Sequence, residues 1–289
     1  MRILMLATLA VLSLSGCAPA PPVDGPQSVR SGGLDREYIA TVPSTLDGAA
    51  PLVVVLHGGF GSAEQAQDAY GWDELAESEG FVVVYPDGLG KAWNAGGGCC
   101  GSSGKNGVDD VAFIESVVSR VERSVEIDPA RVFVTGMSNG GMMSYRLACD
   151  TDVFAAVAPV AGTLLGECDD PAPTSLLHIH GLADDSVHFD GSPGNGAVEI
   201  DGEPVDDLVD YWRTVDGCSE PVSIVDSPVT TSSAECGART VSLITIDGAG
   251  HQWPGSTRSR AQERLGADEP SSAIDATAVI WEFFASHPG

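Results

Sequence analysis

The chain has 289 residues, of which 41 are acidic and 14 basic, so its formal net charge is −27. A surface of that sign repels nucleic acid and anionic lipid headgroups, so the composition excludes nucleic-acid binding and electrostatic attachment to a membrane. The hydrophobic content of 43% suits a globular protein, and the sequence holds no internal repeat, so we expect one large α/β domain.

Residues 1–16 have the features of an export signal. Arg2 is followed by an apolar stretch, residues 3–14, that is too short to span a membrane. This stretch leads into Leu14-Ser15-Gly16-Cys17, which resembles the cleavage box of bacterial lipoproteins. We therefore expect export and a lipidated Cys17 that anchors the mature chain at the cell surface or in the periplasm, unless it is released. The alternative is an ordinary signal peptide with an incidental cysteine.

The next segment, residues 17–34, is rich in proline, glycine and serine and predicts a disordered tether. The folded domain would then comprise residues 35–289, where strand and helix patterns alternate. The expected strands are residues 37–42, 52–56, 81–85, 132–135, 155–160, 176–179 and 241–246. The expected helices are residues 63–79, 109–126, 204–214 and 272–285. This alternation predicts a mostly parallel sheet with helices on both faces, the layout of the α/β-hydrolase fold.

The most informative segment of the chain is residues 132–141. A β-branched run leads into Gly136-Met137-Ser138-Asn139-Gly140, and an apolar, helix-like stretch follows. A strand, a sharp turn and a helix are the context in which Gly-x-Ser-x-Gly forms a nucleophile elbow, and a side chain at either glycine would obstruct the turn. We therefore predict that Ser138 is a catalytic nucleophile. Without that context the motif would be only a loop of small residues.

A serine hydroxyl needs a positioned base, which is itself oriented by a carboxylate. In this fold the acid and then the histidine follow the nucleophile, each in a loop after a strand. The strand at residues 176–179 is followed by Asp184 and Asp185, of which we favour Asp184, although aspartates are also common in such turns. The last strand runs into a Gly-rich loop that carries His251, our candidate for the base.

Acyl transfer also needs hydrogen-bond donors for the developing oxyanion. One would be the N–H of Asn139, the residue after the nucleophile, and the other would come from the turn after residues 52–56. In that turn we favour Gly59 N–H, with Phe60 as the alternative, and we interpret His57 as a structural hydrogen-bonding residue. Without the elbow, this turn would be an ordinary Gly-rich connection.

Three aromatic side chains near these motifs are candidates for substrate binding. Trp93 and Trp253, with Phe60, could line an acyl pocket, since aromatic walls suit an apolar or phenolic acyl group. Core packing is an equally open interpretation of the two tryptophans. No charged residue precedes Ser138 at the strand end, which favours an uncharged acyl moiety.

Six cysteines lie beyond Cys17, and an even number in an exported chain favours disulfides. They are Cys99, Cys100, Cys149, Cys168, Cys218 and Cys236. Because their spacing lacks the Cys-x-x-Cys pattern of zinc sites, we expect no metal. The sequence alone cannot choose among the pairings. We expect that Cys218 bonds to Cys236, and that the adjacent Cys99 and Cys100 bond outward to Cys149 and Cys168.

Several motifs together resemble one family, the polyhydroxybutyrate depolymerase and feruloyl esterase group of α/β-hydrolases, which includes bacterial lipoproteins. The motifs are His57-Gly58-Gly59, Trp93 with Cys99-Cys100, Val108-Asp109-Asp110-Val111, residues 136–142, His180-Gly181-x-Ala183-Asp184 and Gly250-His251-x-Trp253-Pro254-Gly255. The resemblance runs from about Asp35 to the C-terminus. It implies a triad of Ser138, His251 and Asp184 that hydrolyses carboxylic esters with no metal or organic cofactor.

The resemblance leaves the substrate open among short-chain, hydroxycinnamoyl, polysaccharide-borne and hydroxyalkanoate esters. No polymer-binding domain follows the hydrolase, which argues against efficient attack on insoluble polyester. The alternatives are an acyltransferase or peptidase on the same fold, and a surface lipoprotein that binds a ligand without catalysis. The complete set of three catalytic side chains argues against the last.

Overall fold

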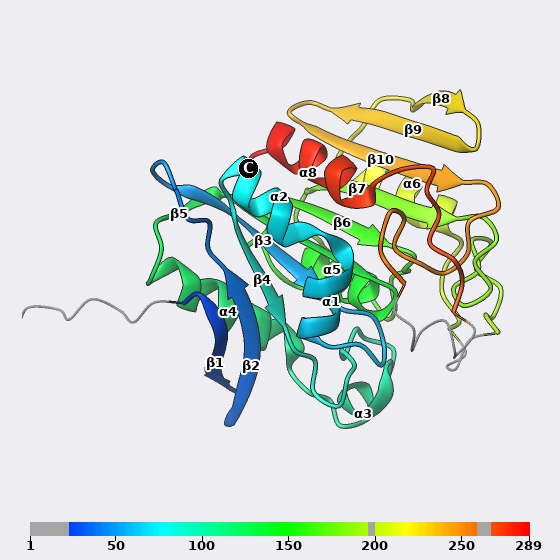
Figure 1. Ribbon diagram of the computed structural model, residues 1–289. Coiled ribbons are helices and arrows are strands. Elements are labelled where there is room, and N and C mark those ends of the chain that lie inside the picture. Colours follow the sequence, from blue (N-terminus) through cyan, green and yellow to red (C-terminus); the bar gives the residue numbers. More distant parts are fainter. Residues whose placement is uncertain (1–22, 196–199, 259–266) are drawn as a thin grey trace, which may run out of the picture.

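The computed structural model describes residues 23–195, 200–258 and 267–289 (Figure 1). These residues form a ten-stranded sheet in the order β1-β2-β4-β3-β5-β6-β7-β10-β9-β8. The strands are β1 (Gly25–Ser31), β2 (Leu34–Thr41), β3 (Ala50–Leu56), β4 (Val82–Pro86), β5 (Ile127–Met137), β6 (Ala156–Val160), β7 (Ser175–Gly181), β8 (Val222–Asp226), β9 (Val229–Cys236) and β10 (Arg239–Ile246). From β4 across to β10 the neighbours are parallel, and the outer strands are antiparallel. This sheet confirms the predicted α/β-hydrolase class.

Helices cover both faces of the sheet (Figure 1). They are α1 (Ala63–Tyr70), α2 (Trp72–Glu79), α3 (Gly101–Lys105), α4 (Asp110–Glu122), α5 (Asn139–Asp150), α6 (Val205–Val215) and α8 (Ala276–Ser286). Side chains of α4, α5 and α6 share one buried core, and those of α1, α2 and α8 share the other. Along β3, Val54 belongs to the first core, and its neighbours Val53 and Val55 belong to the second. A strand covered on both faces is therefore apolar throughout, as the sequence of β3 predicts.

The predicted helix at residues 63–79 is two helices in the structure. Gly71 has a φ of 77°, which ends α1 in the left-handed region and starts α2 at Trp72. Glycine adopts this conformation without the strain that a Cβ causes. The helix expected from residue 109 begins at Asp110, and the side chain of Asp109 caps it by accepting a hydrogen bond from Ala112 N–H.

The expected tether at residues 17–34 is wrong for the part that the structure describes. Val23 is buried, and β1 pairs antiparallel with β2 along its whole length, from Gly25 opposite Ala40 to Ser31 opposite Leu34. Alternate residues of β1 are partly buried and the others exposed, so the segment forms an edge strand despite its proline and glycine. The export signal, Cys17 and the first part of the tether lie outside the described residues. The domain therefore begins at least ten residues before position 35, by the position of β1.

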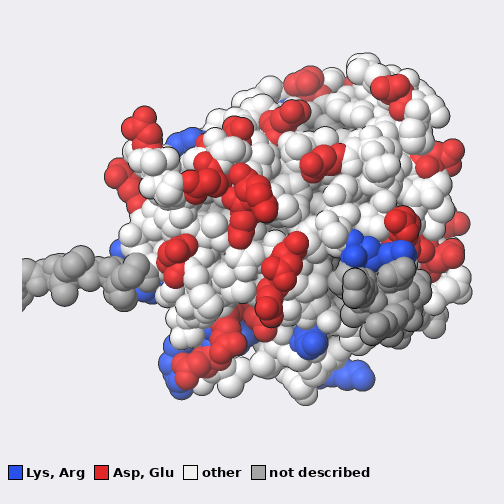
Figure 2. Space-filling view, viewed as in Figure 1, with Lys and Arg blue, Asp and Glu red and all other residues white. Residues whose placement is uncertain are grey.

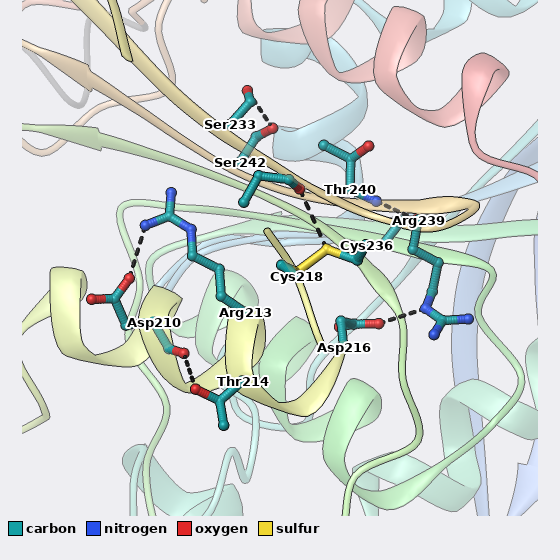
Figure 3. The surroundings of a disulfide bond; sticks show 12 residues. Asp210, Arg213, Thr214, Asp216, Cys218, Ser233, Cys236, Arg239, Thr240 and Ser242 are labelled. Carbon is teal, nitrogen blue, oxygen red and sulfur yellow. Dashed lines mark hydrogen bonds and ion pairs between the residues drawn. A yellow bond between two sulfur atoms is a disulfide. The ribbon is translucent and has the colours of Figure 1, made fainter. Parts of the chain in front are cut away.

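Three disulfides join the six cysteines. The bond between Cys218 and Cys236 is confirmed, and Figure 3 shows it tying the segment after α6 to the end of β9. The expected outward bonds of Cys99 and Cys100 are wrong, because these two are joined to each other. Cys149, at the end of α5, pairs instead with Cys168, whose Cα lies 5.7 Å away. Disulfides of this kind are typical of proteins that fold in an oxidising compartment outside the cytoplasm.

The surface carries the excess of acidic residues in separate groups. Figure 2 shows these groups spread over one face of the molecule, with few basic side chains between them. Among the described residues, none of the helices has the length and apolar character to cross a bilayer.

Candidate active site

Ser138 lies at the sharp turn between β5 and α5. Its backbone has φ 55° and ψ −120°, which is unusual for a residue with a side chain. The turn is crowded, since a Cβ on Gly140 would come within 2.3 Å of Leu56 O and one on Gly136 within 2.6 Å of the backbone of Gly140. The structure thus supplies the physical reason for both glycines of the motif. It holds the Ser138 side chain at the carboxyl end of the sheet.

The three predicted side chains meet at this end of the sheet. Ser138 Oγ lies 2.8 Å from His251 Nε2, and His251 Nδ1 lies 2.7 Å from Asp184 Oδ2. Because a carboxylate only accepts hydrogen bonds, His251 carries its proton on Nδ1 and donates it to Asp184. Nε2 is then free to accept the proton of the Ser138 hydroxyl. This geometry is that of a nucleophile, a base and an orienting acid.

Asp184 is buried and fully engaged, whereas Asp185 is not. Asp184 Oδ1 accepts hydrogen bonds from the N–H groups of Ser186 and Val187, both at 2.8 Å, so both carboxylate oxygens have partners. Burial acts to raise the pKa of Asp184, but the hydrogen bond and charge of His251 outweigh it and hold that pKa below its usual value. The side chain of Asp185 is 89% exposed. The geometry therefore favours Asp184, as the sequence did.

A second aspartate, which the sequence analysis did not single out, positions the backbone of the histidine loop. Asp268 Oδ2 accepts the N–H of His251 at 2.7 Å. The same carboxylate fills the space beside Gly250, where a Cβ would come within 2.3 Å of it. Asp268 follows the last strand by more than twenty residues and belongs to no motif, so only the folded loop reveals its role.

The turn after β3 lies against the elbow and holds a candidate oxyanion donor. Phe60 N–H donates to Lys91 O at 2.8 Å, which removes it as an oxyanion donor. Gly59 N–H has no acceptor among the described residues, and the Cβ position of Gly59 lies 3.9 Å from Asn139 Cβ. Asn139 is the first residue of α5, where a backbone N–H has no partner within the helix. The N–H groups of Gly59 and Asn139 are therefore the candidate oxyanion donors beside Ser138.

His57 holds this turn from within the core. Its Nδ1 lies 2.7 Å from Gly58 O, and its Nε2 accepts the N–H of Gly88 at 2.9 Å, so the proton is on Nδ1. Burial lowers the pKa of His57, in keeping with a neutral ring. The residue is a structural hydrogen-bonding group, as the sequence analysis interpreted it.

A cavity of about 250 Å³ opens beside Ser138. Its lining is largely apolar or backbone and comprises Gly59, Phe60, Gly90, Lys91, Ala92, Cys100, Gly101, Ser138, Asn139, Met142, Ser186, Val187, Ile200 and His251. Phe60 is 71% exposed at this site, so the structure places it where a substrate can contact it. This volume lies slightly below the usual range of about 300–1,000 Å³ for ligand sites.

The two tryptophans predicted for the cavity wall pack in the core instead. Trp93 is fully buried, and its indole N–H donates to His57 O at 2.8 Å. Its backbone N–H also donates to the side-chain oxygen of Asn139 at 2.7 Å, so it supports the elbow from behind. Trp253 stacks on Tyr70 with the ring centroids 4.4 Å apart. Large aromatic side chains bury the most apolar area, and here the core uses them.

No group of three or more histidine, cysteine, aspartate or glutamate side chains within the described residues could hold a metal ion.

Comparison with known proteins identifies the family. Residues 38–211 match the family model described as Esterase PHB depolymerase. The chain belongs to this esterase family. The putative esterase NocK of Nocardia uniformis subsp. tsuyamanensis is 32% identical over 79% of this chain and 73% of that protein. A probable feruloyl esterase C of Aspergillus terreus is 32% identical over 76% of this chain and 84% of that protein. The resemblance seen in the sequence is confirmed, and this esterase is a carboxylic ester hydrolase.

Solved structures agree on the fold of the esterase. The acetyl xylan esterase from Aspergillus awamori aligns with a TM-score of 0.61 at 17% identity, over 84% of this chain and 98% of that one. A putative dienelactone hydrolase from Klebsiella pneumoniae gives a TM-score of 0.57, also at 17% identity, over 90% of this chain and 97% of that one.

Proposed function

We propose that this esterase hydrolyses carboxylic esters through an acyl-enzyme on Ser138. The proposal depends on one observation, the unbroken hydrogen-bonded series from Ser138 Oγ through His251 to Asp184. His251 Nε2 takes the hydroxyl proton as Oγ bonds to the ester carbonyl carbon. Asp184 holds the ring in position and stabilises the imidazolium that forms.

The charge that develops on the carbonyl oxygen needs donors that are already in place. Gly59 and Asn139 N–H supply them at the nucleophile, and each such donor is worth roughly 10²–10³ in rate. His251 then gives the proton to the alcohol oxygen as the ester C–O bond breaks. Water loses a proton to His251 and attacks the acyl carbon, and Ser138 leaves with that proton. The ester and one water become an acid and an alcohol.

The cavity supports a compact acyl group as the substrate class, uncharged where it meets the apolar side chains, with Lys91 as a charged residue of the lining. Its apolar side chains, Met142, Val187 and Ile200, suit a short chain or a single ring, and exposed Phe60 offers a surface for an aromatic acyl group. We therefore propose short-chain, hydroxycinnamoyl or hydroxyalkanoate esters, free or borne on a polymer. Rates on methyl ferulate, acetylated xylan and hydroxybutyrate oligomers would distinguish these classes.

Replacing the nucleophile tests the mechanism. The Ser138→Ala variant should lose on the order of 10⁴- to 10⁶-fold in kcat on p-nitrophenyl acetate, because acylation needs the hydroxyl. A melting temperature of the variant equal to that of the wild type would show that the fold is intact. Cleavage by the variant at the wild-type rate would overturn the mechanism.

We also propose that the esterase is exported and anchored through a lipid on Cys17. The lipoprotein-like sequence at residues 14–17 supports this, and the three disulfides favour an oxidising compartment. The Cys17→Ala variant should move from the membrane fraction to the soluble fraction, since two or three acyl chains are needed for firm anchoring. Unchanged partitioning would refute lipidation.

A further inference from the structure

A series of buried polar side chains lies behind the catalytic acid. Tyr145 OH is 2.6 Å from His178 Nδ1, His178 Nε2 is 2.9 Å from His180 Nδ1, and His180 Nε2 is 2.8 Å from Val187 O. Tyr145 comes from α5, and the two histidines come from β7. All three side chains are at most 1% exposed, so no water competes for these hydrogen bonds. We name Tyr145, His178 and His180 the buried relay.

The direction of every hydrogen bond in the buried relay is fixed by its last acceptor. A carbonyl oxygen cannot donate, so His180 carries its proton on Nε2 and accepts at Nδ1. His178 must then donate from Nε2 and accept at Nδ1, where the Tyr145 hydroxyl donates. Both rings are neutral, because burial lowers the pKa of each histidine. With both rings neutral, this is the one arrangement of protons that satisfies all three contacts.

The buried relay ends on the residue that holds Asp184. The carbonyl of Val187 accepts from His180, while the N–H of the same residue donates to Asp184 Oδ1 at 2.8 Å. His180 Nε2 also lies 3.6 Å from Asp184 Oδ2, the oxygen that binds His251. Val187 is therefore held at both its N–H and its carbonyl oxygen, and the residue lines the cavity. At the other end, Tyr145 belongs to the helix that starts directly after the nucleophile.

We propose that the buried relay positions the acid of the catalytic site, so that Tyr145, His178 and His180 are positioning residues for ester hydrolysis. This rests on the proposed function, since it assigns the relay the task of aligning Asp184 with His251. Fixed hydrogen bonds transmit this alignment from the nucleophile helix to the acid loop. Apolar residues could fill the same core position on β7, but they could not hold Val187 O.

The test compares variants of the buried relay with a matched control. His180→Phe removes the hydrogen bond to Val187, whereas His180→Gln keeps an acceptor and a donor at similar positions. Tyr145→Phe removes only the terminal hydroxyl. The control is Tyr85→Phe, which removes an equally buried tyrosine hydroxyl that donates to Asp73, 2.7 Å away, on the other side of the sheet. Each variant is assayed for kcat and KM on a soluble p-nitrophenyl ester and for melting temperature.

We expect kcat to fall about 10- to 100-fold in His180→Phe with KM changed less than about threefold, because the acid loop shifts but the cavity remains. His180→Gln should recover a large part of the loss. In Tyr145→Phe, kcat should fall about tenfold. Tyr85→Phe should keep the wild-type kcat, although its stability should decrease about as much as that of Tyr145→Phe. If the buried relay served stability alone, its variants would have lower melting temperatures, but kcat would not fall relative to KM.

Proton NMR provides a readout that does not depend on turnover. The low-field resonance of the His251 Nδ1–H that bonds Asp184 should shift or broaden in Tyr145→Phe and stay unchanged in Tyr85→Phe. Ser138→Ala should keep this resonance, so an active Ser138→Ala would refute the acyl-enzyme while the NMR comparison still decides the relay. Wild-type kcat and an unmoved resonance in Tyr145→Phe would overturn the inference, even if His180→Phe failed to fold.

Discussion

Changing Asp184 to asparagine should abolish most of the activity, because the ring proton of His251 would move from Nδ1 to Nε2. The Oδ1 position faces two N–H donors, from Ser186 and Val187, and can only be occupied by an oxygen. The asparagine NH₂ group must then take the Oδ2 position, 2.7 Å from His251 Nδ1, where it donates. Nδ1 must accept, so the ring proton moves to Nε2 and points at Ser138.

The magnitude follows from that tautomer. With a proton on Nε2, His251 cannot take the hydroxyl proton, and the same exchange in serine proteases lowers kcat about 10⁴-fold. This corresponds to about 5 kcal/mol of lost transition-state stabilisation. The volume and hydrogen-bonding pattern of the site stay almost the same, so the fold and KM should change little.

Initial rates on p-nitrophenyl acetate, with a melting curve for each variant, measure this effect. The neighbouring Asp185→Asn is the matched control, because its side chain is exposed and lacks contact with the triad, and it should keep wild-type activity. An Asp184→Asn variant within tenfold of wild type, or an equal loss in Asp185→Asn, would refute the reasoning.

Two further predictions concern stability. The double change Cys218→Ser and Cys236→Ser should lower the free energy of unfolding by about 3 kcal/mol, since the bond spans 18 positions, with kcat unchanged at low temperature; unaltered denaturant midpoints would contradict it. Three buried histidines, His57, His178 and His180, have pKa values lowered by burial, so below about pH 6.5 the unfolded chain binds more protons than the folded one. Stability should therefore be full above that pH and fall as the pH drops towards 5, by up to about 1.4 kcal/mol per pH unit for each histidine. A melting temperature that stays constant from pH 8 to 5 would show that the three rings bind protons in the folded chain as readily as in the unfolded one.

Local sequence patterns determined the site to a large extent. The Gly-x-Ser-x-Gly motif is a steric requirement of the elbow, because any side chain at Gly136 or Gly140 meets backbone atoms. The order of strands and loops then placed Asp184 and His251 at strand ends, since parallel strands finish at one edge of a sheet. These predictions rest on short-range geometry, which the sequence encodes directly.

Contacts between distant segments were decided only by the folded chain. The sequence did not predict β1, β8 or β9, which lie at or next to the sheet edges and become strands by pairing with their neighbours. It left Trp93 and Trp253 open between the cavity wall and the core, because composition cannot tell which aromatic side chains the core will bury. It also paired Cys99 and Cys100 outward, since spacing along the chain says little about distance in space.

The three side chains of the hydrogen-bonded series, Ser138, His251 and Asp184, could thus be predicted by residue, while their support could not. Asp268 contacts the site through one hydrogen bond to His251 N–H, and Tyr145 is connected to it through the hydrogen bonds of the buried relay. Both residues bond to segments that are not their neighbours in the sequence. Residue types and local order carry the chemistry of the reaction. The positions of the reacting atoms depend on packing and hydrogen bonds across the sheet, which arise when the whole domain folds.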